Sequence, residues 1–287
     1  MRVILFVLCF LFLASNVWAK ELITYAHLTN DTWQIWVMDP DGQNKRQVTF
    51  SAQDKRDPTW VNGGQKIAFR TSNSQLFTVD SDGKNEQEIL KKYGVVTNPC
   101  FSRVTNEIVF IRFDPRGKDR ADIWKSDLTG EHSKLLTKDQ TGRFQPRFSP
   151  LGDKIAFVQK DREDPDYHIW MMNADGSDPR QLTTGKGFDT HPDFSPDQTV
   201  ITFSSNRNEN NYEVYSLELK TMTIKQLTHY SGLDTQSRFS SDGKKIVFVS
   251  NRSGDQQIWA MNTDGSDPVA LTHENTESID PAWGKIE

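Results

Sequence analysis

Cysteine is nearly absent from this 287-residue sequence, which contains only Cys9 and Cys100. Cys9 lies within an apolar run, Val3 to Leu13, that follows a positively charged N-terminus and is followed by small residues up to Ala19. This pattern is typical of a secretory signal peptide, so we expect residues 1–19 to be removed by cleavage after Ala19. The run is shorter than the roughly 20 residues that a membrane span requires, so no span is expected. Cys100 would then be the only cysteine left, and no intramolecular disulfide is expected.

An excess of positive charge is also lacking. The sequence has 34 Lys and Arg against 39 Asp and Glu, with a formal net charge of −5. Loss of Arg2 with the signal peptide changes this to −6. Nucleic-acid-binding proteins present concentrated basic faces, whereas these charges are interspersed, so no nucleic-acid partner is expected.

Familiar catalytic motifs are missing as well. The sequence contains no Gly-x-Ser-x-Gly, no phosphate-cradling Gly-rich loop and no His-Glu-x-x-His. After residue 19 it also lacks helical apolar periodicity, low-complexity tracts and linkers, which favours one domain over residues 20–287. We therefore expect a protein that is not an enzyme.

What the sequence does contain is one repeat of about 45 residues. Each copy holds four short segments of alternating apolar residues, separated by turns such as Asp-Gly, and this pattern predicts a four-stranded antiparallel meander with strands A to D. The copies are aligned on one anchor position in strand A, spaced by 41 to 47 residues: Pro58, Pro99, Pro146, Pro192, Ser237 and Pro281.

The two ends of the chain give the number of blades. The first segment supplies strand B (Leu22 to Ala26), strand C (Gln34 to Met38) and strand D (Arg46 to Thr49) but no strand A, and the C-terminus supplies a lone strand A (Asp280 to Trp283). If these segments complete one blade, the ring closes without free sheet edges. The predicted fold is all-β, a six-bladed β-propeller. Aromatic residues of strands A and B are expected to pack between blades: Trp60, Phe101, Phe148, Phe194, Phe239 and Trp283 in strand A, and Tyr25, Phe69, Phe110, Phe157, Phe203 and Phe248 in strand B.

Several motifs carry a family resemblance over nearly all of residues 20–287. They are Asp189-x-x-Pro192-x-Phe194-Ser195-Pro196-Asp197, Ile201-x-Phe203 with Ser205-Asn206-Arg207, and the second copy Ser250-Asn251-Arg252, Ile258-Trp259-x-Met261 and Asp264-Gly265. This pattern resembles the propeller repeat of the TolB family. The resemblance implies a periplasmic propeller of the Tol–Pal cell-envelope system, which binds the peptidoglycan-associated lipoprotein. The same repeat also occurs in peptidase propellers and propeller lyases. TolB itself has an α/β domain before the propeller, and here we expect a stand-alone propeller without it.

The geometry of a propeller predicts where a ligand would bind. The A–B and C–D turns lie at one end of the ring, and the more variable B–C and D–A loops lie at the other, where functional residues are expected. Strand A is innermost, so its leading residues should surround the channel at the D–A end. The predicted ligand-binding residues are Asp57, Asn98, Gln145, His191, Gln236, Asp280, Arg143, Arg147 and Arg238. The alternative is that these residues cap strand ends and contact channel water.

A metal site is a weaker alternative. His191, His229 and His273 follow strand D in successive blades, and three histidines could hold a metal with one open position. No compact motif supports such a site, so no cofactor is expected, although a divalent cation in the central channel stays an alternative. The recurring pattern Asp/Asn-x-Asp-Gly, as at Asp39 to Gly42, is interpreted as hairpin geometry rather than a calcium loop.

The expected function is that of a monomeric periplasmic binding scaffold. Its partner would be a protein or peptide of the cell envelope, or another envelope component, held at the channel mouth. One alternative is a metal-assisted lyase or hydrolase that receives acidic oligosaccharides on Lys55, Arg143, Arg147 and Arg238. Another is a structural module of an exported assembly.

Overall fold

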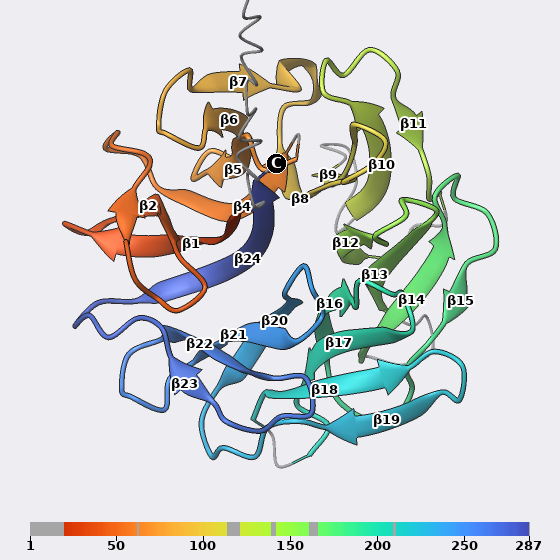
Figure 1. The fold of residues 1–287 in the computed structure, drawn as a ribbon. Helices are drawn as coiled ribbons and strands as arrows, with labels where there is room; N and C mark the ends of the chain where they lie inside the picture. The colour runs from red at the N-terminus through yellow and green to blue at the C-terminus, as the bar shows by residue number, and fades with distance from the viewer. Residues whose placement is uncertain are drawn as a thin grey trace, which may run out of the picture.

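Six four-stranded antiparallel sheets are arranged in a ring in the computed structural model (Figure 1). The structure describes residues 20–61, 63–113, 121–138, 142–160, 166–208 and 211–286. The predicted signal peptide, residues 1–19, lies outside these ranges. In each sheet the predicted strand A is innermost and strand D is outermost, so the prediction of a six-bladed β-propeller is confirmed.

The strands follow the chain in blade order. Blade 1 contains β24 (Ser278–Ile286), β1 (Lys20–Thr29), β2 (Thr32–Met38) and β3 (Arg46–Gln47). Blade 2 contains β4 (Lys55–Val61), β5 (Lys66–Thr71), β6 (Leu76–Asp80) and β7 (Gln87–Ile89), and blade 3 contains β8 (Val96–Phe101), β9 (Glu107–Phe113), β10 (Ala121–Asp127) and β11 (Lys134–Leu135). Blade 4 contains β12 (Arg143–Phe148), β13 (Lys154–Lys160), β14 (Tyr167–Asn173) and β15 (Arg180–Gln181). Blade 5 contains β16 (Asp189–Phe194), β17 (Val200–Ser205), β18 (Glu213–Glu218) and β19 (Thr223–Gln226). Blade 6 contains β20 (Asp234–Phe239), β21 (Lys245–Ser250), β22 (Gln257–Asn262) and β23 (Val269–Ala270).

The ring is closed by pairing between the two ends of the chain. Strand β24 runs antiparallel to β1, from Lys20 opposite Ile286 to His27 opposite Ser278. Both strands are longer than predicted, because each continues the ladder of the other. Among the described residues, the only helical turn is the 3₁₀ segment η1 (Lys91–Tyr93), and no helix there is long and apolar enough to cross a membrane.

The outer strand of most blades is short. Strand β3 ends at Gln47 rather than at the predicted Thr49, because the Thr49 Oγ1 atom accepts a hydrogen bond from the backbone N–H of Ile35 at 3.0 Å. The equivalent threonine of four later blades does the same to its own strand C, at 2.8 to 3.0 Å: Thr137, Thr183, Thr228 and Thr272. A side chain therefore replaces the ladder where the chain turns inward to the next blade.

The core lies between blades. The strand B aromatics are buried, with Phe69, Phe110, Phe203 and Phe248 at 0% exposure. Five of the six strand A aromatics are also buried, and the sixth, Trp60, packs against the cluster shared by blades 1, 2 and 6. This confirms the prediction of interblade packing.

The Asp-Gly turns connect strands C and D within a blade and pack against the preceding blade. Gly42, Gly83, Gly176 and Gly265 have φ between 82° and 94°, a conformation that hairpin turns require. A Cβ atom on Gly176 would lie 2.9 Å from the backbone oxygen of Leu136 in the preceding blade. The acidic residue of the same turn, Asp175, accepts hydrogen bonds from the N–H and hydroxyl of Ser177. The hairpin interpretation of this motif is thus confirmed.

Candidate functional site

Every innermost strand has a β-bulge at the same point. In blade 2, Asp57 and Pro58 together lie opposite the single residue Phe69 of β5. The same two-against-one arrangement recurs in the other blades, opposite Tyr25, Phe110, Phe157, Phe203 and Phe248. The anchor of the sequence repeat is therefore the second residue of a bulge.

The residue types explain why the bulge forms there. The second bulge residue is proline in five blades and Ser237 in the sixth, and proline has no N–H to contribute to a ladder, so it is tolerated where pairing is interrupted. The first bulge residue has a left-handed backbone with φ between 50° and 56° in all six blades. That conformation costs about 1–2 kcal/mol for a residue with a side chain, least for Asn and Asp. The six first residues form what we call the mouth ring: Asp57, Asn98, Gln145, His191, Gln236 and Asp280.

Hydrogen bonds connect the mouth ring from blade to blade. The Gln145 Oε1 atom accepts from the backbone N–H of His191 at 2.7 Å, and Gln236 Oε1 accepts from the N–H of Asp280 at 2.7 Å. Asn98 and Asp280 accept in the same way from the next ring residue, at 3.4 Å and 3.2 Å. Four of the six neighbouring pairs in the ring are linked by a side chain of one blade and the backbone of the next, which holds these side chains in fixed positions.

The mouth ring surrounds a cavity of about 160 Å³ in the D–A half of the channel, which we call the D–A cavity. All six predicted ring residues line it, together with Arg56, Arg147, Arg238 and prolines of the bulges. The Asn98 Nδ2, Gln145 Nε2 and His191 Nε2 atoms make no hydrogen bond with any described residue. These groups are available to a ligand. All six ring residues lie around the channel, and that they bind a ligand stays a prediction.

Two carboxylates meet on one side of the ring. The Asp280 Oδ2 atom accepts from Arg56 Nε at 3.0 Å, and Asp57 Oδ2 accepts from Arg70 Nε at 2.8 Å. Gln236 Nε2 also donates to Asp280 Oδ1 at 2.8 Å. Burial, followed by the charge of Asp280, raises the pKa of Asp57, while the two arginines oppose this shift. The acidic side of the ring is thus already hydrogen-bonded within the protein.

Arg147 of blade 4 and Arg238 of blade 6 bring positive charge to the channel. Arg238 is 9% exposed; its Nη1 donates to Ser237 O at 2.7 Å, while its Nε is buried without a hydrogen-bond partner among the described residues. Burial and the charge of Arg147 lower the pKa of Arg238 to about 9, with Asp193 acting in the opposite direction. Burial and the charge of Arg238 lower the pKa of His191 to about 3, so this imidazole is neutral at pH 7.

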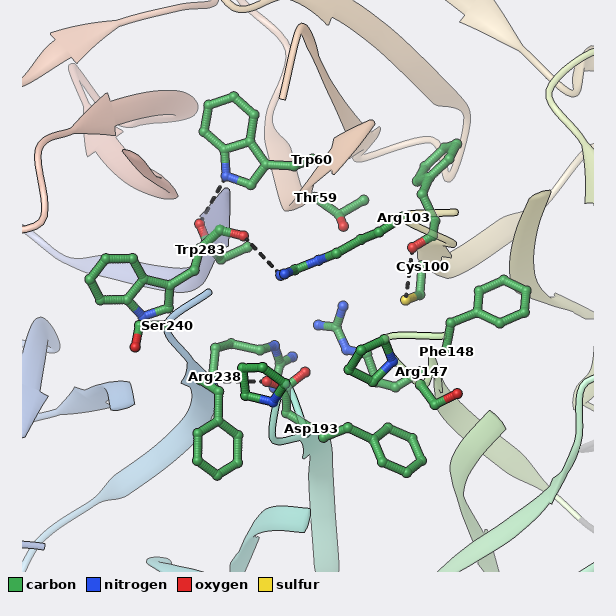
Figure 2. A pocket seen from close by; sticks show the side chains of 17 residues that line it. Thr59, Trp60, Cys100, Arg103, Arg147, Phe148, Asp193, Arg238, Ser240 and Trp283 are labelled. Atoms are coloured by element: carbon green, nitrogen blue, oxygen red, sulfur yellow. Dashed lines mark hydrogen bonds between the residues drawn. The ribbon is translucent and has the colours of Figure 1, made fainter. Parts of the chain in front are cut away.

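Arg147 and Arg238 also line a second cavity, of about 80 Å³, in the A–B half of the channel, which we call the A–B cavity. Figure 2 shows their guanidinium groups turned toward the same central space, with Arg103 reaching in from another side. The walls include Trp60, Phe148 and Trp283, and Asp193 is the only carboxylate among the lining residues. The two arginines therefore form the waist of the channel, between the two cavities.

Arg143 lies elsewhere. It is 4% exposed, its Nε donates to Gln159 Oε1 at 2.8 Å, and it is not among the residues that line either cavity. The equivalent position is buried in every blade: Lys55 donates to Ser51 Oγ and Gln53 O, and Asp189 accepts from Arg207 at 2.7 Å. The pleat turns these side chains away from the channel, so Arg143 and Lys55 are not placed to contact a channel ligand.

The three histidines of the alternative metal site have different surroundings. His191 lines the D–A cavity, whereas His229 and His273 are exposed. Within the described ranges, no group of three or more His, Cys, Asp or Glu side chains could hold a metal ion. Sequence reasoning missed Arg56, Arg70 and Arg103, and the only available signal was the position of Arg56 directly before a ring residue.

Comparison with known proteins identifies the repeat. A family model described as the TolB beta propeller domain matches residues 70–210 and 208–286. The Tol-Pal system protein TolB of Anaeromyxobacter dehalogenans is 29% identical over 118 residues, which cover 41% of this chain and 26% of that protein. Dipeptidyl-peptidase 5 of Porphyromonas endodontalis is 22% identical over 224 residues, covering 60% of this chain and 32% of that protein. The chain thus spans less than a third of the length of these curated relatives.

Solved structures show the same fold. TolB from Acinetobacter baumannii has a TM-score of 0.77 at 22% identity, covering 92% of this chain and 66% of that one. An oligogalacturonate lyase in complex with manganese has a TM-score of 0.59 at 16% identity, covering 88% and 74%. Identities this low bear on the fold and not on activity. The family model, which matches well over half of the chain, shows that this protein belongs to the family of TolB β-propeller domains.

Proposed function

We propose that this propeller is a non-enzymatic binding scaffold of the bacterial periplasm, and that it holds an extended peptide segment of a cell-envelope protein at the D–A end of its channel. The periplasmic location rests on the predicted signal peptide and on family membership. The choice of a peptide as the ligand rests on the chemistry of the mouth ring, and this chemistry is the main support for the proposal.

The available groups of the mouth ring are neutral and polar. Asn98 and Gln145 offer carboxamide N–H donors, and His191 offers a neutral imidazole. A peptide backbone presents carbonyl acceptors and N–H donors at regular intervals, and uncharged partners bind it without the cost of desolvating an ion. Because the bulges and interblade hydrogen bonds already fix these side chains, little side-chain entropy is lost on binding.

The experiment compares two double variants in affinity capture from envelope extracts. The site variant is Asn98→Ala with His191→Ala, which removes two available groups of the ring. The control variant is Asp242→Ala with Lys244→Ala, an exposed pair in the A–B turn of blade 6 at the opposite end of the ring. Melting temperatures of both variants are measured first, so that loss of folding is recognised.

We expect the wild type and the control variant to recover the same partner and the site variant to lose it. The bound segment is then mapped by limited proteolysis and synthesised as a peptide. Loss of two hydrogen bonds predicts an affinity at least tenfold weaker for the site variant. Equal affinity for a folded site variant and the wild type would refute binding at the mouth ring.

A further inference from the structure

We propose that the waist of the channel is a carboxylate-binding site, in which Arg147 and Arg238 hold one carboxylate group between them. This inference does not depend on the peptide proposal, since it concerns the inner part of the channel and holds for a free carboxylate as well.

The first observation is an imbalance of charge. The A–B cavity is lined by Arg103, Arg147 and Arg238 against a single carboxylate, that of Asp193. The Asp193 Oδ2 atom is already engaged, because it accepts a hydrogen bond from the backbone N–H of Phe239 at 2.9 Å. Asp280, which lines the D–A cavity, is a second carboxylate whose charge acts on Arg238. Three guanidinium groups against these two carboxylates leave positive charge that a bound anion would compensate.

The second observation is an unused donor. Arg238 is only 9% exposed, and its Nε atom is buried without a hydrogen-bond partner among the described residues. Arg147 makes no hydrogen bond or ion pair with any described residue, and its charge is close enough to Arg238 to depress the pKa of that guanidinium. Two guanidinium groups therefore repel each other at one constriction, and both have N–H donors without partners among the described residues. Such donors match the two oxygen atoms of a carboxylate.

The A–B cavity is the smaller of the two. Its volume of about 80 Å³ is half that of the D–A cavity, at about 160 Å³. A carboxylate group fits this space. Aromatic side chains, including Trp60 and Phe148, form part of its wall. A wall of low dielectric constant strengthens the attraction between the guanidinium groups and an anion.

The carboxylate could belong to a small free acid or to a bound chain. Both cavities share Arg147 and Arg238, so an acidic side chain or a C-terminal carboxylate can reach the waist from either end. The test therefore uses acetate as the free anion, acetamide as its neutral isostere, and short acetylated peptides ending in either a free carboxylate or an amide.

The proteins are the wild type, Arg147→Gln, Arg238→Gln and the control Arg180→Gln, which changes an exposed arginine of the outer strand β15. Binding is measured by calorimetry at constant ionic strength, with thermal unfolding as a second readout. For the wild type and the control we expect saturable binding of acetate but not acetamide. We expect at least tenfold weaker binding in each waist variant.

A further readout separates binding from structure. If the two arginines are retained for an anion rather than for stability, Arg147→Gln should melt at the same or a higher temperature than the wild type without acetate, and should gain nothing from acetate. Tighter binding of the free-carboxylate peptide than of acetate assigns the group to a bound chain, and the reverse assigns it to a small acid. Equal responses to acetate and acetamide, or unchanged acetate affinity in a folded Arg147→Gln protein, would overturn the proposal.

Discussion

The contact between Gln236 and Asp280 allows a quantitative test of the mouth ring. Gln236 both accepts from the Asp280 N–H at 2.7 Å and donates to the Asp280 carboxylate at 2.8 Å, joining blade 6 to the closing strand. In Gln236→Glu, the donated hydrogen bond is replaced by a contact between two carboxylates. At an effective dielectric constant of 20, two charges about 4 Å apart repel by about 4 kcal/mol.

Proton uptake limits the size of this penalty. A glutamate with an ordinary pKa of about 4.3 can be neutralised at pH 7 for about 3.7 kcal/mol, and at pH 4.5 for about 0.5 kcal/mol. Once protonated, the introduced carboxyl group can donate to Asp280 as the glutamine does. Because the folded state of the variant binds the extra proton, its stability relative to the wild type falls as pH rises. We expect a loss of about 3–4 kcal/mol at pH 7 and less than about 1 kcal/mol at pH 4.5.

The assay is urea denaturation of both proteins at the two pH values. The matched control is Gln256→Glu, in which Gln256 donates to the partly exposed Glu277 at 3.2 Å. Surface repulsion of this kind should cost less than about 1 kcal/mol at either pH. A penalty for Gln236→Glu that is the same at both pH values, or no larger than that of Gln256→Glu, would refute the ring geometry.

Three further predictions concern the same framework. Burial and the charge of Arg238 lower the pKa of His191 to about 3, so below about pH 6.5 the unfolded state binds a proton that the folded state excludes. The wild type therefore loses about 2 kcal/mol of stability from this residue between about pH 6.5 and 4.5, and His191→Gln should not lose it. Urea denaturation at both pH values measures the difference, and parallel pH profiles of the two proteins would contradict this prediction. Gln145→Gly should be more stable than Gln145→Ala by about 1 kcal/mol, because φ is 51° there, and a more stable alanine variant would count against the left-handed bulge. Gly176→Ala should lower the free energy of unfolding by about 1–2 kcal/mol more than Gly185→Ala, as measured by thermal unfolding. Both glycines have positive φ, but only a Cβ atom at position 176 meets the backbone of Leu136. Equal losses in the two variants would argue against this interblade contact.

The fold was predictable because the sequence pattern that determines it is local and recurs in every blade. Each blade has the same order of alternating strands and turns, and the missing strand A at the start matches the lone strand at Asp280 to Trp283. Strand lengths were less predictable, because they depend on partners distant in the chain. Strand β24 continues to Ile286 because β1 lies beside it, and β3 stops early because a Thr49 hydroxyl takes the place of a ladder bond.

The mouth ring was predictable in position but not in conformation. Strand order places Gln145 and Asp280 beside the channel, yet the bulge and the left-handed backbone arise from pairing that the sequence does not display. Arg143 illustrates the limit of this reasoning. It precedes Gln145 by two residues, but the pleat and the bulge direct it between blades rather than into the channel. Arg147, beyond the bulge, lines both cavities as expected for a channel residue.

The most direct test of peptide binding at the mouth ring is a crystal structure of the propeller with the peptide segment recovered by affinity capture. We expect the peptide to lie at the D–A end of the channel, with backbone groups within hydrogen-bonding distance of Asn98, Gln145 and His191. A peptide bound at the A–B end or on the outer strands of the blades, with the mouth ring uncontacted, would contradict the proposal.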